Sequence, residues 1–249
     1  MDRRSSVTTR WTRFRKALRQ LNVPLTVSVV LAQTAAAYFL GSGMDFALFR
    51  EATLETNPEV WLPAYGYWLL YPFMLLPHRL SFALIVLAST SLIAYAGQRL
   101  TGSGLPALFS SAAFLAAETG QIDGFIVLGI TLGVLACERE APHLLGVGLL
   151  LMSLKPQIGL VAAVWMLIYM RDWRTLLIPA AVFLFSLLVE GLWPLELLRS
   201  PPQLTLAPQN VSLWRVWGPY ALPLLALPFM LGRDRPRRAV PLAVAVSVL

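Results

Sequence analysis

Residues 120–137 read GQIDGFIVLGITLGVLAC. The stretch is apolar except for two polar side chains near its start, Gln121 and the charged Asp123, and for Thr131. A run of this kind is typical of a helix that crosses a membrane. Gly129 and Gly133 form a GxxxG pattern, which favours close packing against a neighbouring helix. The stretch therefore predicts a membrane helix whose polar start, at Gln121 and Asp123, lies at one face of the membrane.

Similar apolar runs recur along the chain of 249 residues, of which 57% are hydrophobic and only 13% charged. This composition excludes a disordered chain and argues against a soluble domain. The sequence predicts an all-α, polytopic transmembrane bundle with about eight membrane segments. Nine apolar runs are present, one of which is not expected to span: Val23–Leu40, Tyr65–Pro77, Leu80–Ala96, Leu105–Ala117, Ile122–Cys137, Leu144–Leu154, Ile158–Met170, Leu176–Val189 and Pro219–Leu231.

The net charge of +7 is concentrated in two short clusters, at residues 2–19 and 233–238. Basic residues next to membrane segments mark cytoplasmic loops, so this pattern indicates membrane orientation rather than nucleic-acid binding. We expect an integral protein of a bacterial-type plasma membrane, with residues 1–20 as a basic cytoplasmic tail. Residues 21–249 then form one transmembrane domain with outer loops at 41–66 and 190–217, the first of which carries an interfacial helix.

The orientation of the segments places Asp45, Gln121 and Lys155 on the same outer side. Three apolar segments nevertheless separate the outer loop 41–66 from Gln121, whereas an even number is needed. One of the segments 65–77, 80–96 or 105–117 must therefore be interrupted, re-entrant or interfacial.

Most standard catalytic patterns are absent, including a P-loop, a dinucleotide-binding glycine motif, HExxH and GxSxG. His78 and His143 have no spacing that suggests a ligand pair. The ligand-type residues of 137–143 are interpreted as a solvated turn, so no metal site is expected. Cys137 is the only cysteine, which excludes an internal disulfide.

Lys155 interrupts the apolar sequence between Leu144 and Tyr169 and precedes Pro156. An ionisable group at membrane depth suggests function, although a lysine at a helix end also reaches solvent by snorkelling. Asp45 is either a loop carboxylate that caps a helix over 46–54 or part of the same outer-face site. Arg50 is either a phosphate-binding group or a partner of Glu51 or Glu55.

Five short motifs occur along the chain. They are Asp45-Phe-Ala-Leu-Phe49 with Asn57-Pro58, Tyr71-Pro72 with Leu76-Pro77, Gly120-Gln-Ile-Asp123, Leu154-Lys-Pro156 and Asn210-Val-Ser-Leu-Trp214. Their order resembles glycosyltransferase family 87, also called DUF2029, whose members use polyprenyl-phosphate sugars and have the GT-C fold. Three of the five motifs differ from the family's pattern, at Glu59, Phe73 and Asp123. Since the sequence stops within an apolar run, we expect a C-terminally shortened member of the family.

The resemblance implies transfer of a hexose, mannose in the first place, from a polyprenyl-phosphate carrier to an acceptor at the outer face, with inversion. Asp45 would be the general base, and Lys155 would hold the donor phosphate. Gln121 and Asp123 would bind sugar hydroxyls, with Arg50 and Asn210 as further substrate-binding candidates. The donor is a substrate, and the scheme requires no cofactor and no metal.

Two other functions remain open at the level of sequence. A non-catalytic membrane subunit of a larger complex, with a degenerate GT-C fold, would account for the small size and the altered motifs. A small transporter would account for interrupted helices and for Lys155, although the sequence lacks two matching halves. An enzyme requires Asp45 and Lys155 to face one cavity that is open to the outer leaflet. A cavity filled by side chains, or an Asp45 side chain in bulk water, would favour the subunit.

Overall fold

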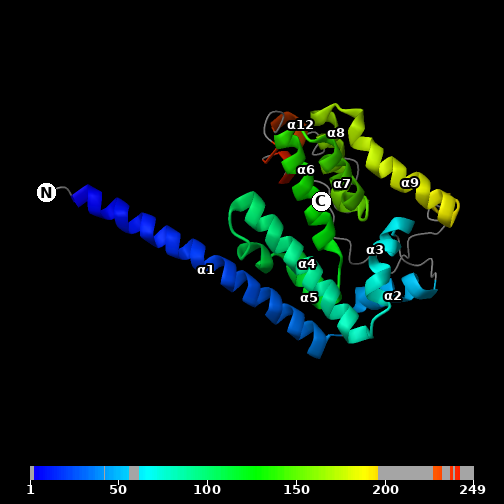
Figure 1. Ribbon diagram of the computed structural model, residues 1–249, viewed down its shortest axis with the longest axis horizontal. Helices are drawn as coiled ribbons and strands as arrows, with labels where there is room; N and C mark the ends of the chain where they lie inside the picture. The colour runs from blue at the N-terminus through cyan, green and yellow to red at the C-terminus, as the bar shows by residue number, and fades with distance from the viewer. Residues whose placement is uncertain are drawn as a thin grey trace.

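The computed structural model describes residues 3–41, 43–55, 62–195, 227–231, 236–237 and 239–241, and all the regular elements within these ranges are helices. Figure 1 shows the helices as a bundle from which the first helix extends. The elements are α1 (Arg3–Leu40), α2 (Met44–Glu55), α3 (Ala64–Met74), α4 (His78–Thr101), η1 (Pro106–Phe109), α5 (Ser111–Thr119), α6 (Asp123–Arg139), α7 (Pro142–Met152), α8 (Pro156–Met170), η2 (Trp173–Leu176), α9 (Leu177–Glu190) and α12 (Leu227–Leu231).

Helix α1 is continuous through the predicted basic tail and the first apolar segment, with Pro24 inside it. Its second half lies along α4, where Val30 packs with Ala94 and Leu108. The Ser103 hydroxyl donates to the Asn22 side-chain oxygen at 2.9 Å and ties the end of α4 to α1. The first apolar segment is thus fixed to the bundle along one face.

Helices α6 and α7 approach each other through glycines. A Cβ atom added to Gly129 would lie 2.8 Å from the Gly148 carbonyl oxygen, and one added to Gly148 would lie 2.8 Å from the Gly129 carbonyl oxygen. Side chains at these positions would force the two backbones apart. The predicted role of the GxxxG pattern in close helix packing is confirmed at Gly129.

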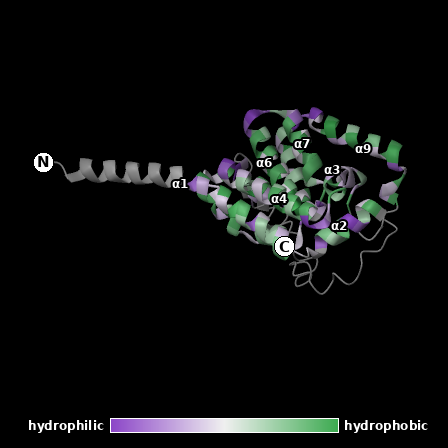
Figure 2. Cartoon of the chain, turned by 60° about the horizontal axis from the view of Figure 1, so that its bottom comes forward, coloured by the Kyte–Doolittle hydropathy of each residue, from purple (hydrophilic) through white to green (hydrophobic). Residues whose placement is uncertain are grey.

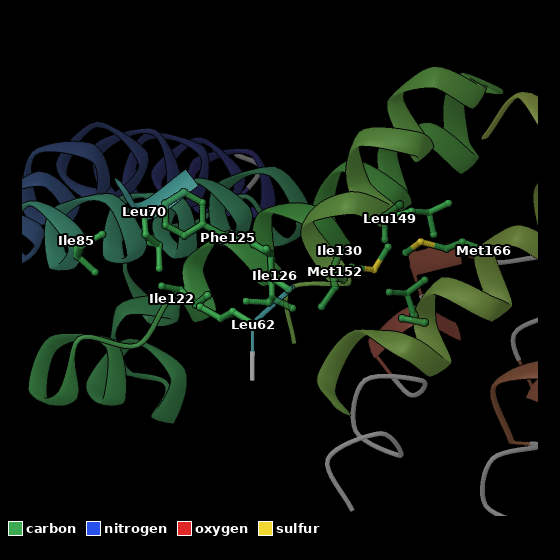
Figure 3. Packing of buried hydrophobic residues seen from close by; sticks show 14 of the residues in the cluster. Leu62, Leu70, Ile85, Ile122, Phe125, Ile126, Ile130, Leu149, Met152 and Met166 are labelled. Carbon is green, nitrogen blue, oxygen red and sulfur yellow. The ribbon is translucent and has the colours of Figure 1, made fainter. Parts of the chain in front are cut away.

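The main hydrophobic core runs the length of α6 (Figure 3). Near the start of α6, Ile122 and Ile126 pack with Leu62, Leu70 and Ile85. Farther along, Ile130 lies beside residues of α7 and α8, namely Leu149, Met152 and Met166. Helix α6 is therefore the central element against which the other helices are positioned.

Three helical stretches among the described residues are long and apolar enough to cross a membrane: Asn22–Leu40, His78–Thr101 and Trp173–Glu190. Hydrophobic residues dominate α4, α6, α7 and α9 in Figure 2. The all-helical membrane architecture agrees with the sequence prediction, but the predicted count of about eight spanning segments is not confirmed. Several predicted segments form shorter helices, and most of Pro219–Leu231 lies outside the described residues.

Of the three segments among which the sequence places an interruption, 105–117 is broken. The chain forms η1 there, turns at Ser110 and then begins α5, with the Ser110 hydroxyl accepting from the Ala113 amide at 3.3 Å. Helix α3 has only 11 residues and is also too short to span. Helix α4 is the one described element of this region that is long and apolar enough to span. The even number of spans expected between the loop 41–66 and Gln121 is therefore not confirmed.

Candidate functional site

Four polar side chains from three distant parts of the sequence meet at the end of the bundle where α2, α6 and α8 begin. Lys155 Nζ donates to Asp123 Oδ1 at 2.6 Å and to Gln121 Oε1 at 3.0 Å. Gln121 Nε2 in turn donates to Asp45 Oδ2 at 2.8 Å. We refer to Asp45, Gln121, Asp123 and Lys155 as the polar cluster, in which one amide links a carboxylate to an ammonium group.

Pro156, the first residue of α8, determines the backbone conformation of Lys155. A residue before proline avoids the helical region, and Lys155 has a non-helical backbone, with φ −133° and ψ 81°. Its carbonyl oxygen still accepts from the amides of Ile158 and Gly159. The side chain is 15% exposed and faces Asp123, which is 10% exposed. The ion pair is thus largely buried, and Lys155 does not reach bulk solvent by snorkelling.

Gln121 and Asp123 lie in the tight connection between α5 and α6. Helix α5 ends at Gly120 in the left-handed conformation, with φ 78°. A Cβ atom there would lie 2.6 Å from Phe46 Cβ, so only glycine fits. The Ser89 hydroxyl of α4 donates to the Gln121 carbonyl oxygen at 3.0 Å and fixes the connection to the core.

Asp45 belongs to the first turn of α2, which begins at Met44. The interpretation of Asp45 as a residue that precedes and caps this helix is therefore wrong. The next residue, Phe46, is completely buried and contacts the rings of Phe82 and His78 at centroid distances of 5.4 and 5.0 Å. This anchor holds the half-buried Asp45 side chain beside Gln121.

Lys155 lies at a helix N-terminus, which is an unfavourable position for a positive charge. The N-terminal end of a helix carries partial positive charge, which stabilises Asp45 and Asp123 but disfavours Lys155 at the start of α8. Asp123 compensates the ammonium charge directly. With Asp45, Asp123 and Lys155 ionised, the polar cluster carries one net negative charge. Chemically, it combines a carboxylate that can accept a proton with a cation that can contact an anion.

Two predicted site residues remain, Arg50 and Asn210, and the structure describes only Arg50. The Arg50 guanidinium donates to the Leu76 carbonyl oxygen at 2.8 Å and secures α2 to the end of α3. Asn210 lies outside the described residues. His78 packs edge-on against Phe46. Among the described residues, no group of three or more His, Cys, Asp or Glu side chains is arranged to hold a metal ion.

The predicted turn after Cys137 ends α6 at the opposite end from the polar cluster. Glu140 has the left-handed conformation, with φ 52°, and α7 begins at Pro142. Glu138 forms a bidentate ion pair with Arg237, and this hydrogen bonding raises the pKa of the Arg237 guanidinium above its ordinary value. A cavity of about 380 Å³ is lined there by Cys137, Glu140, Tyr169, Met170 and Asp172.

Two supporting residues, Ser89 and Tyr65, escaped the sequence analysis. Ser89 holds Gln121 from α4, and the Tyr65 hydroxyl lies 2.7 Å from the Ser153 hydroxyl oxygen, two residues before Lys155. Both contacts join residues that are distant in the chain, and a serine or tyrosine in an apolar helix gives no sign of its partner. Only the three-dimensional structure identifies them.

Comparison with known families finds that the model of glycosyltransferase family 87 matches residues 63–249, which is most of the chain. Gln121, Asp123 and Lys155 fall within the matched range, whereas Asp45 precedes it. No curated protein and no solved structure matches the chain. The hydrogen bond from Gln121 is thus what connects Asp45 to the family-matched part of the protein.

Proposed function

The chain belongs to glycosyltransferase family 87 and is an integral membrane protein, and from this premise we propose that it transfers a hexose from a polyprenyl-phosphate carrier to an acceptor hydroxyl. Mannose is the proposed sugar, the outer face of the plasma membrane the proposed location, and GT-C the proposed fold. The N-terminus is proposed to be cytoplasmic, in keeping with the basic residues before the first span.

One observation carries this proposal: Gln121 bridges Asp45 and Lys155 by hydrogen bonds of 2.8 and 3.0 Å. Transfer of a sugar from a phosphate requires a base near the acceptor and positive charge near the leaving group. The polar cluster contains one of each, at a separation that a single glutamine spans. An Asp45 side chain directed into solvent would instead have favoured a non-catalytic subunit.

In the proposed reaction, the acceptor hydroxyl gives its proton to Asp45 while its oxygen attacks C1 of the sugar. The bond from C1 to the phosphate oxygen breaks, and the polyprenyl phosphate leaves with the electron pair. Attack on the face opposite the phosphate inverts the configuration at C1. Lys155 contacts the phosphate and stabilises the negative charge that develops on it.

The roles of the neighbours follow from their contacts. Gln121 uses its amide nitrogen on Asp45 and its oxygen on Lys155, so we assign it to positioning both groups. Arg50, bound to the Leu76 carbonyl oxygen, retains free donors for a phosphate or sugar oxygen. Asn210 is kept as a substrate-binding candidate on the sequence motif alone.

The test is sugar transfer by the purified full chain in liposomes, with radiolabelled polyprenyl-phosphate mannose as donor and a membrane lipid extract as acceptor. The matched control replaces the donor with a nucleotide-linked mannose. We expect transfer from the lipid-linked donor alone, with inverted configuration at C1 in the product. Transfer from the nucleotide sugar, or retention at C1, would contradict the proposed donor or mechanism.

A further inference from the structure

Asp123 takes a large share of the hydrogen-bonding capacity of Lys155. An ammonium group has three N–H donors, and Asp123 and Gln121 occupy two of them at 2.6 and 3.0 Å. One donor is left for a phosphate oxygen. The shorter of the two bonds goes to a carboxylate, which carries the same sign of charge as the phosphate that Lys155 is proposed to bind.

Asp123 is also fixed in place. It is the first residue of α6, it is buried, and the adjoining Gly124 lies against the Ser89 backbone of α4. An amide side chain at this point would have the same size and could still accept a hydrogen bond from Lys155, although a weaker one. Because Asp123 is fixed beside Lys155, its negative charge also acts on any anion that approaches Lys155.

The charge of that anion changes during the proposed reaction. The donor is a phosphodiester with a single negative charge, whereas the released polyprenyl phosphate is a monoester with a charge of about −1.5 to −2 at pH 7. Lys155 alone would bind the product more tightly than the donor and would slow its release. A fixed carboxylate repels both anions and repels the more highly charged product more strongly.

We propose that Asp123 is a positioning residue that holds Lys155 and, through its own charge, weakens the binding of the monoester product relative to the diester donor. This inference rests on the proposed function, because it requires a phosphate-linked donor at Lys155. It assigns Asp123 to product release rather than to a sugar hydroxyl.

The experiment measures binding, without sugar transfer, of a polyprenyl monophosphate and of its methyl diester to the full chain in detergent. Asp123→Asn keeps the size and the acceptor oxygen but removes the charge. Since Coulomb energy scales with the charge of the ligand, a gain of about threefold for the diester implies a gain of about ninefold for a doubly charged monoester. Asp172→Asn, beyond the far end of α8, is the matched control and should change neither affinity.

The outcomes separate the inference from the function on which it rests. Wild-type binding of both lipids with equal gains for both in Asp123→Asn, or with no gain, would overturn the role of Asp123 and leave the proposed donor class intact. Failure of the folded wild type to bind either lipid would overturn the donor class and this inference together. If Asp123→Asn does not fold, Asp123→Ser removes the same charge and must show the same preference for the monoester.

Discussion

Helix α6 carries an ion pair at each end, and the two pairs differ in almost every physical respect. At its start, Asp123 pairs with Lys155, and the two side chains are 10% and 15% exposed. At its end, Glu138 pairs with Arg237, and the two side chains are 30% and 55% exposed. The first pair belongs to a network of four side chains, whereas the second is a bidentate contact at the surface.

The difference in burial between the two ion pairs indicates that they have different roles. In many buried ion pairs, the free energy lost by removing two charges from water exceeds the free energy gained from their attraction. The pair of Lys155 and Asp123 is therefore not expected to add much to the stability of the protein. An exposed pair costs little and contributes little. The buried pair, placed at the unfavourable end of α8 for a cation, is therefore best explained by chemistry at the polar cluster. Four predictions test this distinction.

The largest expected effect is on activity at the polar cluster. Asp45→Asn keeps the shape of the side chain but cannot accept the proton, so sugar transfer should fall by about 10²- to 10⁴-fold. The measurement is the initial rate with saturating lipid-linked donor in liposomes. The folded state is checked by the melting temperature in detergent, which should stay near that of the wild type because the introduced amide oxygen can still accept from Gln121.

The matched control for this prediction is Asp172→Asn, the same substitution at a carboxylate that caps η2. It should leave the transfer rate unchanged. Full activity in Asp45→Asn would show that Asp45 is not the base.

The second effect is on stability, and it tests the burial of the pair formed by Lys155 and Asp123. Lys155→Met removes the cation and leaves Asp123 buried without its partner, which should lower the free energy of unfolding by about 3 to 5 kcal/mol. The double substitution Lys155→Met with Asp123→Leu should recover most of that loss, because the buried carboxylate is removed together with the cation. Denaturation in mild detergent measures both. A double variant as unstable as the single one would show that the polar cluster is needed for folding itself.

The third effect concerns the middle of α6, where neither ion pair acts. Gly148→Ala places a methyl group against the Gly129 carbonyl oxygen and should destabilise the protein by about 1 to 3 kcal/mol through overpacking. Val147→Leu, at the adjacent and more exposed position, should change stability by less than about 0.5 kcal/mol. An equal effect of both would mean that the close approach of α6 and α7 does not depend on glycine.

The sequence predicted the helical membrane class because apolar runs are local signals. It placed an interruption among the segments 65–77, 80–96 and 105–117 but did not identify which of them is broken. It also pointed to Asp45, Gln121, Asp123 and Lys155, but not to their hydrogen bonds. A predicted sugar ligand such as Asp123 is found paired with Lys155, 32 residues away. This pairing depends on how α6 and α8 are placed around the core, so it cannot be predicted from a local sequence pattern. The expected span count was not confirmed because short helices such as α3 are as apolar as long ones.

The smallest expected effect is at the far end of α6. Glu138→Gln removes the charge that holds Arg237, yet neither the melting temperature nor the transfer rate should change measurably, because exposed ion pairs are screened by water and salt. The measurement is the same pair of assays, made at low and at physiological salt. If Glu138→Gln instead lowered the transfer rate, the contact between α6 and the segment containing Arg237 would have to influence the polar cluster along the length of α6. Function would then depend on both ends of α6, and the distinction between a buried pair that serves catalysis and an exposed pair that does not would be wrong.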